Sequence, residues 1–96
     1  QISDISVLQN LTSLTELFLH ENQISNISSL QNLTSLTVLG LNHNQISDIE
    51  TLVNNSGLSE GDVINLTGNP LSGTAHDTYI PQLEARGIEV LIEVPW

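Results

Sequence analysis

Histidines and carboxylates are the side chains of this sequence whose types suit metal binding or acid–base catalysis. The chain has three histidines and eleven acidic residues. His20, His43 and His76 lie far apart along the chain, and no H-x-x-x-H pair or carboxylate at ligand spacing joins them. We therefore predict surface histidines, no metal site, no catalytic residue and no cofactor.

Two of these acidic residues, Glu60 and Asp62, lie close together in a segment that also contains Gly57 and Gly61. Two carboxylates are few for a calcium ion, so we expect solvated loop charges. The glycines lack the pattern and the lysine of a phosphate-binding loop. Most serines lie in I-S-x-I segments, where they are typical of turns. The sequence therefore predicts a protein that is not an enzyme.

The overall charge limits the partners of the chain. The net charge is −10, and Arg86 is the only lysine or arginine. Such a chain lacks the cationic patch that binds phosphates, so we predict no nucleic-acid binding and a preference for basic partners. No apolar run approaches the roughly 20 residues of a membrane span, which predicts no membrane insertion. Without cysteine, disulfides and thiolate zinc sites are excluded.

The elements that would position any site come from a repeat with a period of 22 residues. LTSLTELFLHENQIS (residues 11–25) returns as LTSLTVLGLNHNQIS (residues 33–47). A fixed period of this size is the signature of a repeat architecture. We predict a single domain over residues 1–96, with repeats in 1–71 and a C-terminal cap in 72–96. The sequence begins in the middle of a repeat at Gln1, so we expect it to be a fragment of a longer protein.

Apolar residues recur in fixed columns of the repeat. A spacing of two, as between Leu17 and Leu19, is typical of a strand, and the spacing of three elsewhere suits tight turns or 3-10 segments. The chain therefore coils, with these side chains turned inward. The complete columns are Leu11, Leu14, Leu17, Leu19, Ile24, Ile27 and Leu30, then Leu33, Leu36, Leu39, Leu41, Ile46, Ile49 and Leu52.

LTSLTELFLHEN and LTSLTVLGLNHN match the leucine-rich repeat signature L-x-x-L-x-L-x-x-N. With the period and the I-S-[DN]-I segment, the chain resembles the 22-residue class of bacterial internalin-like and SDS22-like proteins. We predict a right-handed α/β leucine-rich-repeat solenoid whose concave face is a parallel sheet of about four short strands. The convex face should be mostly 3-10 or irregular, and the cap should supply the one α-helix.

Asparagines end each copy of the signature, at Asn22, Asn44 and Asn69. An amide has donors and an acceptor that satisfy backbone groups in the turn after a strand. The sequence therefore predicts a structural asparagine ladder, and the resemblance implies the same role.

The third copy and the segment after it depart from the pattern. Asn55 replaces the leucine of Leu11 and Leu33, three residues are inserted, and Pro70 stops the regular coil. Thr74 or Asp77 is the expected cap of a helix that starts at about Asp77 or Thr78 and runs to about Arg86. Arg86 should face the negative end of that helix, and Gly87 should follow its last turn.

Alternating residues from Ile88 to Val94 predict a further strand, which ends in Pro95 and Trp96. No equivalent cap precedes the first repeat. We expect an exposed apolar edge around Ile2, Ile5 and Leu8, and a homodimer through this uncapped N-terminal edge.

The outward-facing residues of the strands are the candidate ligand-binding site. Side chains alternate along a strand, so residues beside the buried leucines point outward on the concave face. Phe18 next to Gly40 is either an exposed anchor for a partner or a ring that packs over Gly40 and Val38. Further outward positions are Gly40, Val63, Glu89, Leu91 and Glu93. The predicted ligand-binding residues are Glu16, Phe18, His20, Val38, Asn42, Asn65 and Thr67.

These patterns predict a non-catalytic interaction module that binds a protein ligand on the concave face. Copies differ on that face while their flanks stay fixed, which fits a binding surface. The alternative is a structural spacer or an engineered repeat scaffold without its own ligand, which the near-identical copies favour. The internalin-like resemblance implies a bacterial protein at the cell surface or outside the cell.

The column assignment is directly testable. Leu39→Ala and Ile46→Ala should each lower the free energy of unfolding by about 2–5 kcal/mol, because each leaves a cavity in the core. Urea melts measure this change. Two variants with the stability of the parent would show that the inward-facing columns are misassigned.

Overall fold

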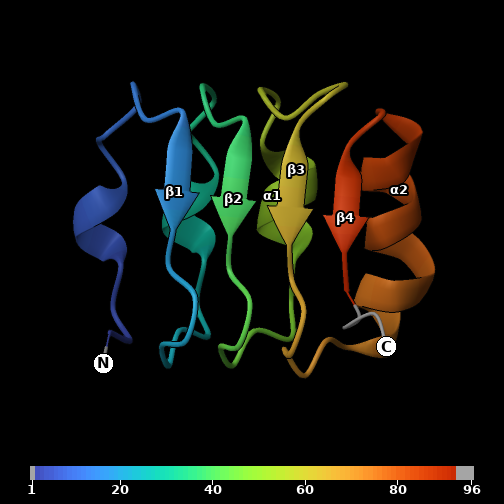
Figure 1. Cartoon of the computed structure of the whole chain (residues 1–96), viewed down its shortest axis with the longest axis horizontal. Helices are drawn as coiled ribbons and strands as arrows, with labels where there is room; N and C mark the ends of the chain where they lie inside the picture. Colours follow the sequence, from blue (N-terminus) through green and yellow to red (C-terminus); the bar gives the residue numbers. More distant parts are fainter. Residues whose placement is uncertain (1, 93–96) are drawn as a thin grey trace.

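The chain folds into successive coils, and each contributes one short strand to a parallel sheet. The computed structural model describes residues 2–92. Four strands pair in the order β1-β2-β3-β4 and every pair is parallel, which confirms the predicted fold class. The elements (Figure 1) are η1 (Ser6–Leu8), β1 (Glu16–Phe18), η2 (Ser28–Leu30), β2 (Val38–Gly40), α1 (Glu50–Asn54), β3 (Val63–Asn65), η3 (Ala75–Tyr79), α2 (Ile80–Ala85) and β4 (Glu89–Leu91).

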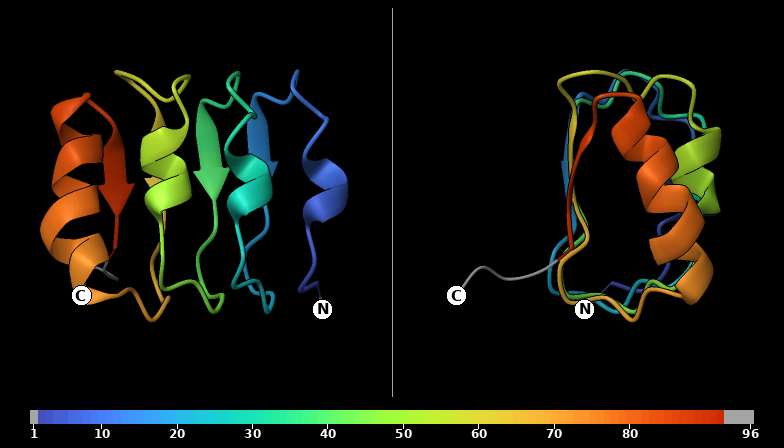
Figure 2. Two further views of the ribbon diagram at one scale, coloured as in Figure 1. Left: turned by 180° about the vertical axis from the view of Figure 1, so that it is seen from behind. Right: turned by 90° about the vertical axis from the view of Figure 1, so that its right-hand side faces the viewer.

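The elements form two layers, with the sheet on one side and the helical segments on the other (Figure 2). Each repeated I-S-[DN]-I segment starts its helical turn through the same contact. Asp4, Asn26 and Asp48 each accept a hydrogen bond of 2.9 Å from the backbone N–H two residues later. This local bond favours a turn over a continued strand. The repeated sequence therefore returns the chain behind the sheet at the same point of each coil.

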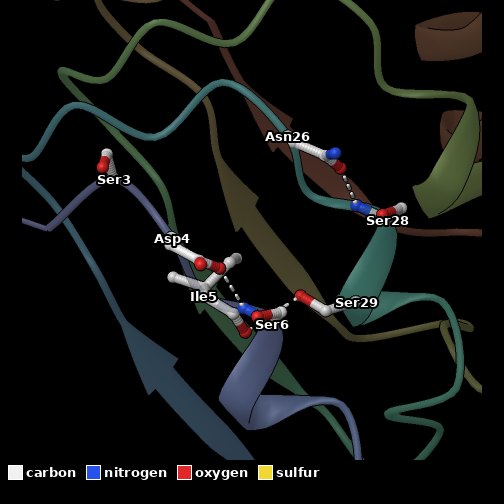
Figure 3. Close-up of a pocket in the computed structure, with 7 residues that line it drawn as sticks. All are labelled: Ser3, Asp4, Ile5, Ser6, Asn26, Ser28 and Ser29. Carbon is white, nitrogen blue, oxygen red and sulfur yellow. Dashed lines mark hydrogen bonds between the residues drawn. The ribbon is translucent and has the colours of Figure 1, made fainter.

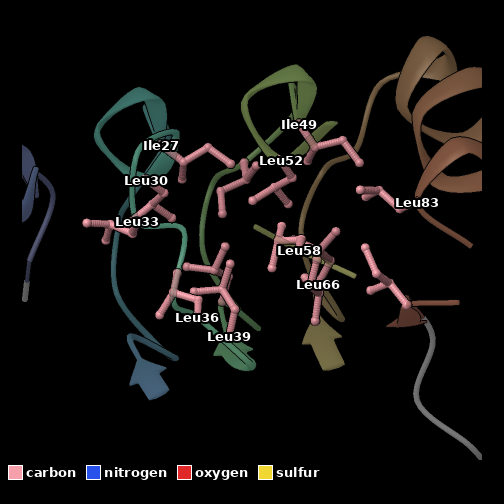
Figure 4. Packing of buried hydrophobic residues seen from close by; sticks show 14 of the residues in the cluster. Ile27, Leu30, Leu33, Leu36, Leu39, Ile49, Leu52, Leu58, Leu66 and Leu83 are labelled. Atoms are coloured by element: carbon pink, nitrogen blue, oxygen red, sulfur yellow. The ribbon is translucent and has the colours of Figure 1, made fainter. Parts of the chain in front are cut away.

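Apolar side chains of the repeat columns fill the space between the two layers (Figure 4). Leu39 and Ile46 are 1% and 0% exposed, as the column assignment requires. The buried apolar residues are Ile5, Ile24, Ile27, Leu30, Leu33, Leu36, Leu39, Leu41, Ile46, Ile49, Leu52, Leu58, Ile64, Leu66, Ala75, Ile80, Leu83 and Ile88.

The N-terminal end of the core is open, but less so than the sequence predicted. Ile2 is 47% exposed, whereas Ile5, predicted at the exposed edge, is only 3% exposed. The next coil covers Ile5, and the Ser29 hydroxyl of that coil donates to its carbonyl oxygen at 3.1 Å. The further exposed apolar residues at this end are Val7 and Leu11, while Leu8 is half-buried.

The third coil contains a short α-helix, α1, where the sequence predicted a mostly 3-10 or irregular convex face. The C-terminal cap is therefore not the only source of α-helix in the chain. Arg86 supplies a physical reason: its Nη1 donates to the Asn55 carbonyl at 3.1 Å, and its Nη2 donates to the Val53 carbonyl. Carbonyls at a helix end lack partners within the helix. Arg86 thus stabilises α1, rather than the end of its own helix as predicted.

Asn55 occupies the column of a buried leucine and is itself only 1% exposed. Its amide nitrogen donates to the carbonyls of Leu30 (2.9 Å) and Leu33 (3.1 Å) in the preceding coil. Its amide oxygen accepts from the Gly57 N–H at 2.9 Å. A buried amide costs little when its polar atoms are paired in this way. The substitution therefore exchanges apolar packing for a polar connection between coils.

Of the two solvated charges predicted in the inserted segment, Glu60 is exposed as expected, whereas Asp62 is buried (7% exposed). Its carboxylate accepts a hydrogen bond of 2.8 Å from the Ser59 N–H and so closes the insertion on itself. The Asp62 carbonyl then accepts from the Glu89 N–H at 2.9 Å. One residue thus shapes the loop and connects it to β4, and its charge serves the fold.

The cap helix starts earlier than predicted. Ser72, rather than Thr74 or Asp77, caps it, because the Ser72 hydroxyl accepts from the Ala75 N–H at 3.1 Å. The helical segment then contains the π-helical turn η3 before α2, where a start near Asp77 was expected. Pro81 explains the wide turn: it has no N–H, and its ring would clash with the carbonyl four residues earlier in a regular α-helix.

The cap packs against the third coil. Burial, and then the charges of Glu50 and Asp48, raise the pKa of the Tyr79 phenol. Those charges lie in and just before α1, so η3 and α1 are neighbours. Gly87 has a φ of 87°, as expected for the residue after a helix. β4 follows at Glu89–Leu91, and the remainder of the predicted strand, Glu93 and Val94, lies with Pro95 and Trp96 outside the described residues.

Gly57 lies directly against the backbone of the preceding coil, which yields a sharp prediction. A Cβ at this position would lie 1.9 Å from the Thr34 carbonyl oxygen. We expect Gly57→Ala to cost about 1–3 kcal/mol, because the backbone of one coil must move away from its neighbour. Gly73→Ala is the matched control, since no atom lies within 4 Å of its added Cβ. Urea melts in which both variants lose the same stability would contradict the close approach.

Candidate protein-binding surface

The three histidines, candidates for metal binding or acid–base catalysis, lie in different parts of the structure. His20 lies next to β1, His43 in the turn after β2, and His76 in η3, all three exposed. Within residues 2–92, no group of three or more histidine, aspartate or glutamate side chains is placed to hold a metal ion. The described residues also contain no helix that is both long and apolar enough to span a membrane.

The signature asparagines bridge neighbouring coils. The Asn44 amide nitrogen donates to the carbonyl of Leu19 at 2.9 Å in the preceding coil and to that of Leu41 at 3.0 Å in its own. Asn69 repeats this pattern one coil later, with bonds of 2.9 Å to Leu41 and 3.0 Å to Leu66. These amides are therefore committed to the backbone and have a structural role.

Asn22 stands at the equivalent position of the first coil. Its amide oxygen accepts from the Ile2 N–H at 2.9 Å, and its nitrogen donates to the carbonyls of Leu19 (3.0 Å) and His20 (3.2 Å). All three partners lie in the same coil as Asn22. The same residue type therefore closes the turn whether or not another coil precedes it.

A second column was missed by sequence reasoning, namely the left-handed residue just before each signature asparagine. Glu21 and His43 have φ values of 58° and 60°, and Gly68 has 78°. The His43 ring lies against Gly68, because a Cβ there would be 2.3 Å from His43 Nδ1. The sequence signal was the glycine itself, which is the residue type that adopts this conformation at least cost.

A polar hollow of about 300 Å³ lies between η1 and η2 (Figure 3). Its side chains already bond the backbone, as with Asp4 to the Ser6 N–H and Asn26 to the Ser28 N–H. The Ser6 N–H, and then its hydroxyl, lower the pKa of Asp4. The hollow is a consequence of two adjacent Asx turns. Its lining is Ser3, Asp4, Ile5, Ser6, Asn26, Ser28 and Ser29.

The sheet presents its outward side chains in two rows that cross the four strands. The helical segments lie behind the sheet, so this face is not covered by any described helix (Figure 2). We call it the open sheet face. The pairing register places Glu16, Val38, Val63 and Glu89 in the first row, and Phe18, Gly40, Asn65 and Leu91 in the second.

Phe18 combines features of both alternatives that the sequence left open. A Cβ on Gly40 would lie 3.0 Å from Phe18 Cδ1, so the ring leans over this glycine. The ring nevertheless remains 58% exposed, while Gly40 is buried. Leu91, at the other end of the row, is 38% exposed. The second row therefore carries two exposed apolar side chains on either side of a shallow centre.

The other predicted ligand-binding residues differ in accessibility. Glu16 and His20 are exposed, whereas Val38, Asn42 and Asn65 are partly buried. Thr67 is only 8% exposed, and its N–H donates to the Asn65 amide oxygen at 3.1 Å. The pairing register thus brings Glu16, Phe18, Val38 and Asn65 onto one face, and Thr67 has little surface for a partner. Strand alignment had also placed Val63, Glu89 and Leu91 on this face without including them among the predicted ligand-binding residues.

The open sheet face carries negatively charged side chains and no lysine or arginine. Glu16 and Glu89 stand at opposite ends of the first row, and both are exposed. Arg86, the only lysine or arginine in the sequence, is engaged by the carbonyls of Val53 and Asn55. It therefore contributes no positive charge to the face, and the face should attract cationic groups.

A parallel sheet built one strand per coil, with a ladder of asparagines beneath it, defines a leucine-rich-repeat solenoid. Residues 12–54 match the family described as leucine-rich repeats, in two copies. The chain belongs to the leucine-rich repeat proteins, and its repeats are internalin-like.

Two solved structures from Listeria monocytogenes show the extent of the similarity. An internalin shares 35% identity over 99% of this chain with a TM-score of 0.78, and internalin C2 shares 32% identity over 98% with a TM-score of 0.73. The alignments cover 28% and 37% of those two proteins. Comparison with the curated proteins gives no match.

Proposed function

We propose that this chain is a non-catalytic module that binds a protein ligand on the open sheet face. The observation that carries the proposal is Phe18, a phenylalanine that is 58% exposed on a strand and lies over a buried glycine. Aromatic side chains held in a fixed position are frequent anchors of protein interfaces. The surrounding contacts come from Glu16, His20, Val38, Asn42 and Asn65, whereas Thr67, at 8% exposed, offers little surface.

Regular structure supports this use of the face. Phe18 is held by strand pairing, since β1 pairs with β2 and places Phe18 opposite Gly40. A side chain on a paired strand loses less freedom on binding than one on a loop, which favours affinity. The internalin-like resemblance supports a bacterial setting at the cell surface or outside the cell, and the partner would be another protein there.

The alternative is a structural spacer, or an engineered repeat scaffold, without a ligand of its own. Near-identity of the coils outside the strands favours it. The two proposals differ in one respect: a spacer has no contact that depends on Phe18.

Affinity capture tests this difference. The immobilised chain should retain a protein from a cell-surface extract, and Phe18→Ala should reduce the retained amount at least about fivefold, as expected for loss of an interface anchor worth over 1 kcal/mol. Gln82→Ala is the control, since Gln82 is exposed but lies in α2, outside the sheet. Equal retention by the parent and Phe18→Ala would favour the spacer.

The open N-terminal edge supports a second, separate proposal, self-association of this 96-residue chain. Ile2, Val7 and Leu11 are 47%, 78% and 46% exposed at this end, and β1 has no partner on its outer side among the described strands. Apolar surface and an unpaired strand edge both favour pairing with a second copy. We expect light scattering to show a dimer at high concentration that Val7→Lys weakens. A monomer at all concentrations would contradict this.

A further inference from the structure

If the open sheet face binds a protein ligand, as proposed above, the distance between its two exposed glutamates defines the kind of ligand more closely. Glu16 and Glu89 occupy the two ends of the first row, separated by β2 and β3. Strands in a sheet lie about 4.8 Å apart, so three such steps separate the two carboxylate-bearing residues by roughly 14 Å. Among the described residues, no hydrogen bond or ion pair engages either carboxylate. Both are therefore available to a ligand.

The centre of the same row is apolar. Val38 and Val63 lie between the two glutamates and are each partly exposed. The row thus reads acidic, apolar, apolar, acidic across the four strands. The second row adds Phe18 and Leu91 as apolar side chains on one flank, with Gly40 and the partly buried Asn65 between them. A ligand that matches this face has positive charge at two ends and an apolar group in the middle.

An extended peptide has the right dimensions for this arrangement. It rises about 3.3 Å per residue, so residues i and i+4 are roughly 13 Å apart, and residues i, i+2 and i+4 point to the same side. Basic side chains at i and i+4 would reach Glu16 and Glu89 together. An apolar side chain at i+2 would then lie over Val38 and Val63. No adjustment of the backbone of the sheet is needed.

We infer that the open sheet face binds an extended protein segment that crosses the strands and carries two basic residues four positions apart with an apolar residue midway. The net charge of −10 draws such a segment toward the chain, and the two glutamates set its register. Phe18 and Leu91 border the segment on one side. An acidic face would attract any basic peptide. The distance between the two glutamates favours a peptide whose basic residues are four positions apart.

Two peptides of identical composition test the spacing. One is acetylated and amidated Lys-Thr-Leu-Thr-Lys, and the other is the permuted Lys-Lys-Thr-Leu-Thr. In an NMR titration of the ¹⁵N-labelled chain at low salt, the first should shift amide signals of β1 to β4 and bind about two- to fivefold more tightly than the second. Affinity should fall as salt is added, because exposed charges are screened.

Matched variants identify the residues responsible. Glu16→Gln and Glu89→Gln should each remove the preference for the first peptide. Glu84→Gln, an equal change of charge at an exposed position of α2, should retain it. The double variant Glu16→Lys with Glu89→Lys should reverse the preference and bind Glu-Thr-Leu-Thr-Glu. This reversal would not result from a loss of folding.

The outcomes separate this inference from the proposed function. Equal affinity for both basic peptides, or a preference that survives Glu16→Gln and Glu89→Gln, overturns the spacing while leaving the face as a binding surface. Absence of any shift on the sheet also overturns it. The proposed function itself is decided by the dependence of protein capture on Phe18, which requires no assumption about the charge of the partner.

Discussion

Stacking of one coil on the next is the interaction on which this structure depends. No coil encloses a core of its own, so a leucine becomes buried only when coils lie on both sides of it. Equivalent residues show the effect, because the first-coil leucines are half-buried and those of the second coil are at most 1% exposed. The pairs are Leu14 and Leu36, Leu17 and Leu39, and Leu19 and Leu41. Burial is therefore a property of position in the stack rather than of residue type.

Close stacking creates a second requirement, since it removes backbone carbonyls from water. The chain meets it with side-chain donors that reach across the boundary between coils. Asn44 and Asn69 do so in the regular turns, Asn55 does so in place of a leucine, and Arg86 does so from the cap. Among the described residues no buried side-chain nitrogen or oxygen lacks a partner. The polar residues of the interior are therefore as necessary to the stack as the leucines.

The sequence predicted what the repeat enforces and missed what single contacts decide. Recurrence in register predicted the columns, the strands and the equivalence of Glu16, Val38 and Val63, because the same pattern must satisfy the same geometry in each coil. The cap occurs once, so no second copy guides its interpretation: the sequence favoured Thr74 or Asp77 as the helix cap, and only the chain path shows that Ser72 has this role. The α1 contact of Arg86 depends on tertiary neighbours, and no local pattern encodes it.

The candidate site shows the same division. Alternation along the strands predicted which residues share the open sheet face, but it does not predict how far each side chain is exposed to solvent. The small exposed area of Thr67 follows from the turn after β3, where its N–H donates to Asn65. The burial of Asp62 likewise arises from closure of the insertion on Ser59. A sequence pattern thus orients side chains reliably, whereas their accessibility depends on loops that the repeat does not constrain.

The stack also explains why function falls on the strands. Inward columns are fixed by packing and the turns by the amide ladder, so outward strand positions are the ones free to change without loss of the fold. They are nevertheless coupled to one another, because strands lie side by side in register: Phe18 leans over its neighbour only because residue 40 is glycine. A larger residue at Gly40 would displace the ring while leaving the coil intact. Adjacent coils therefore shape a joint surface, and the specificity of that surface resides in pairs of residues across strands rather than in any one repeat.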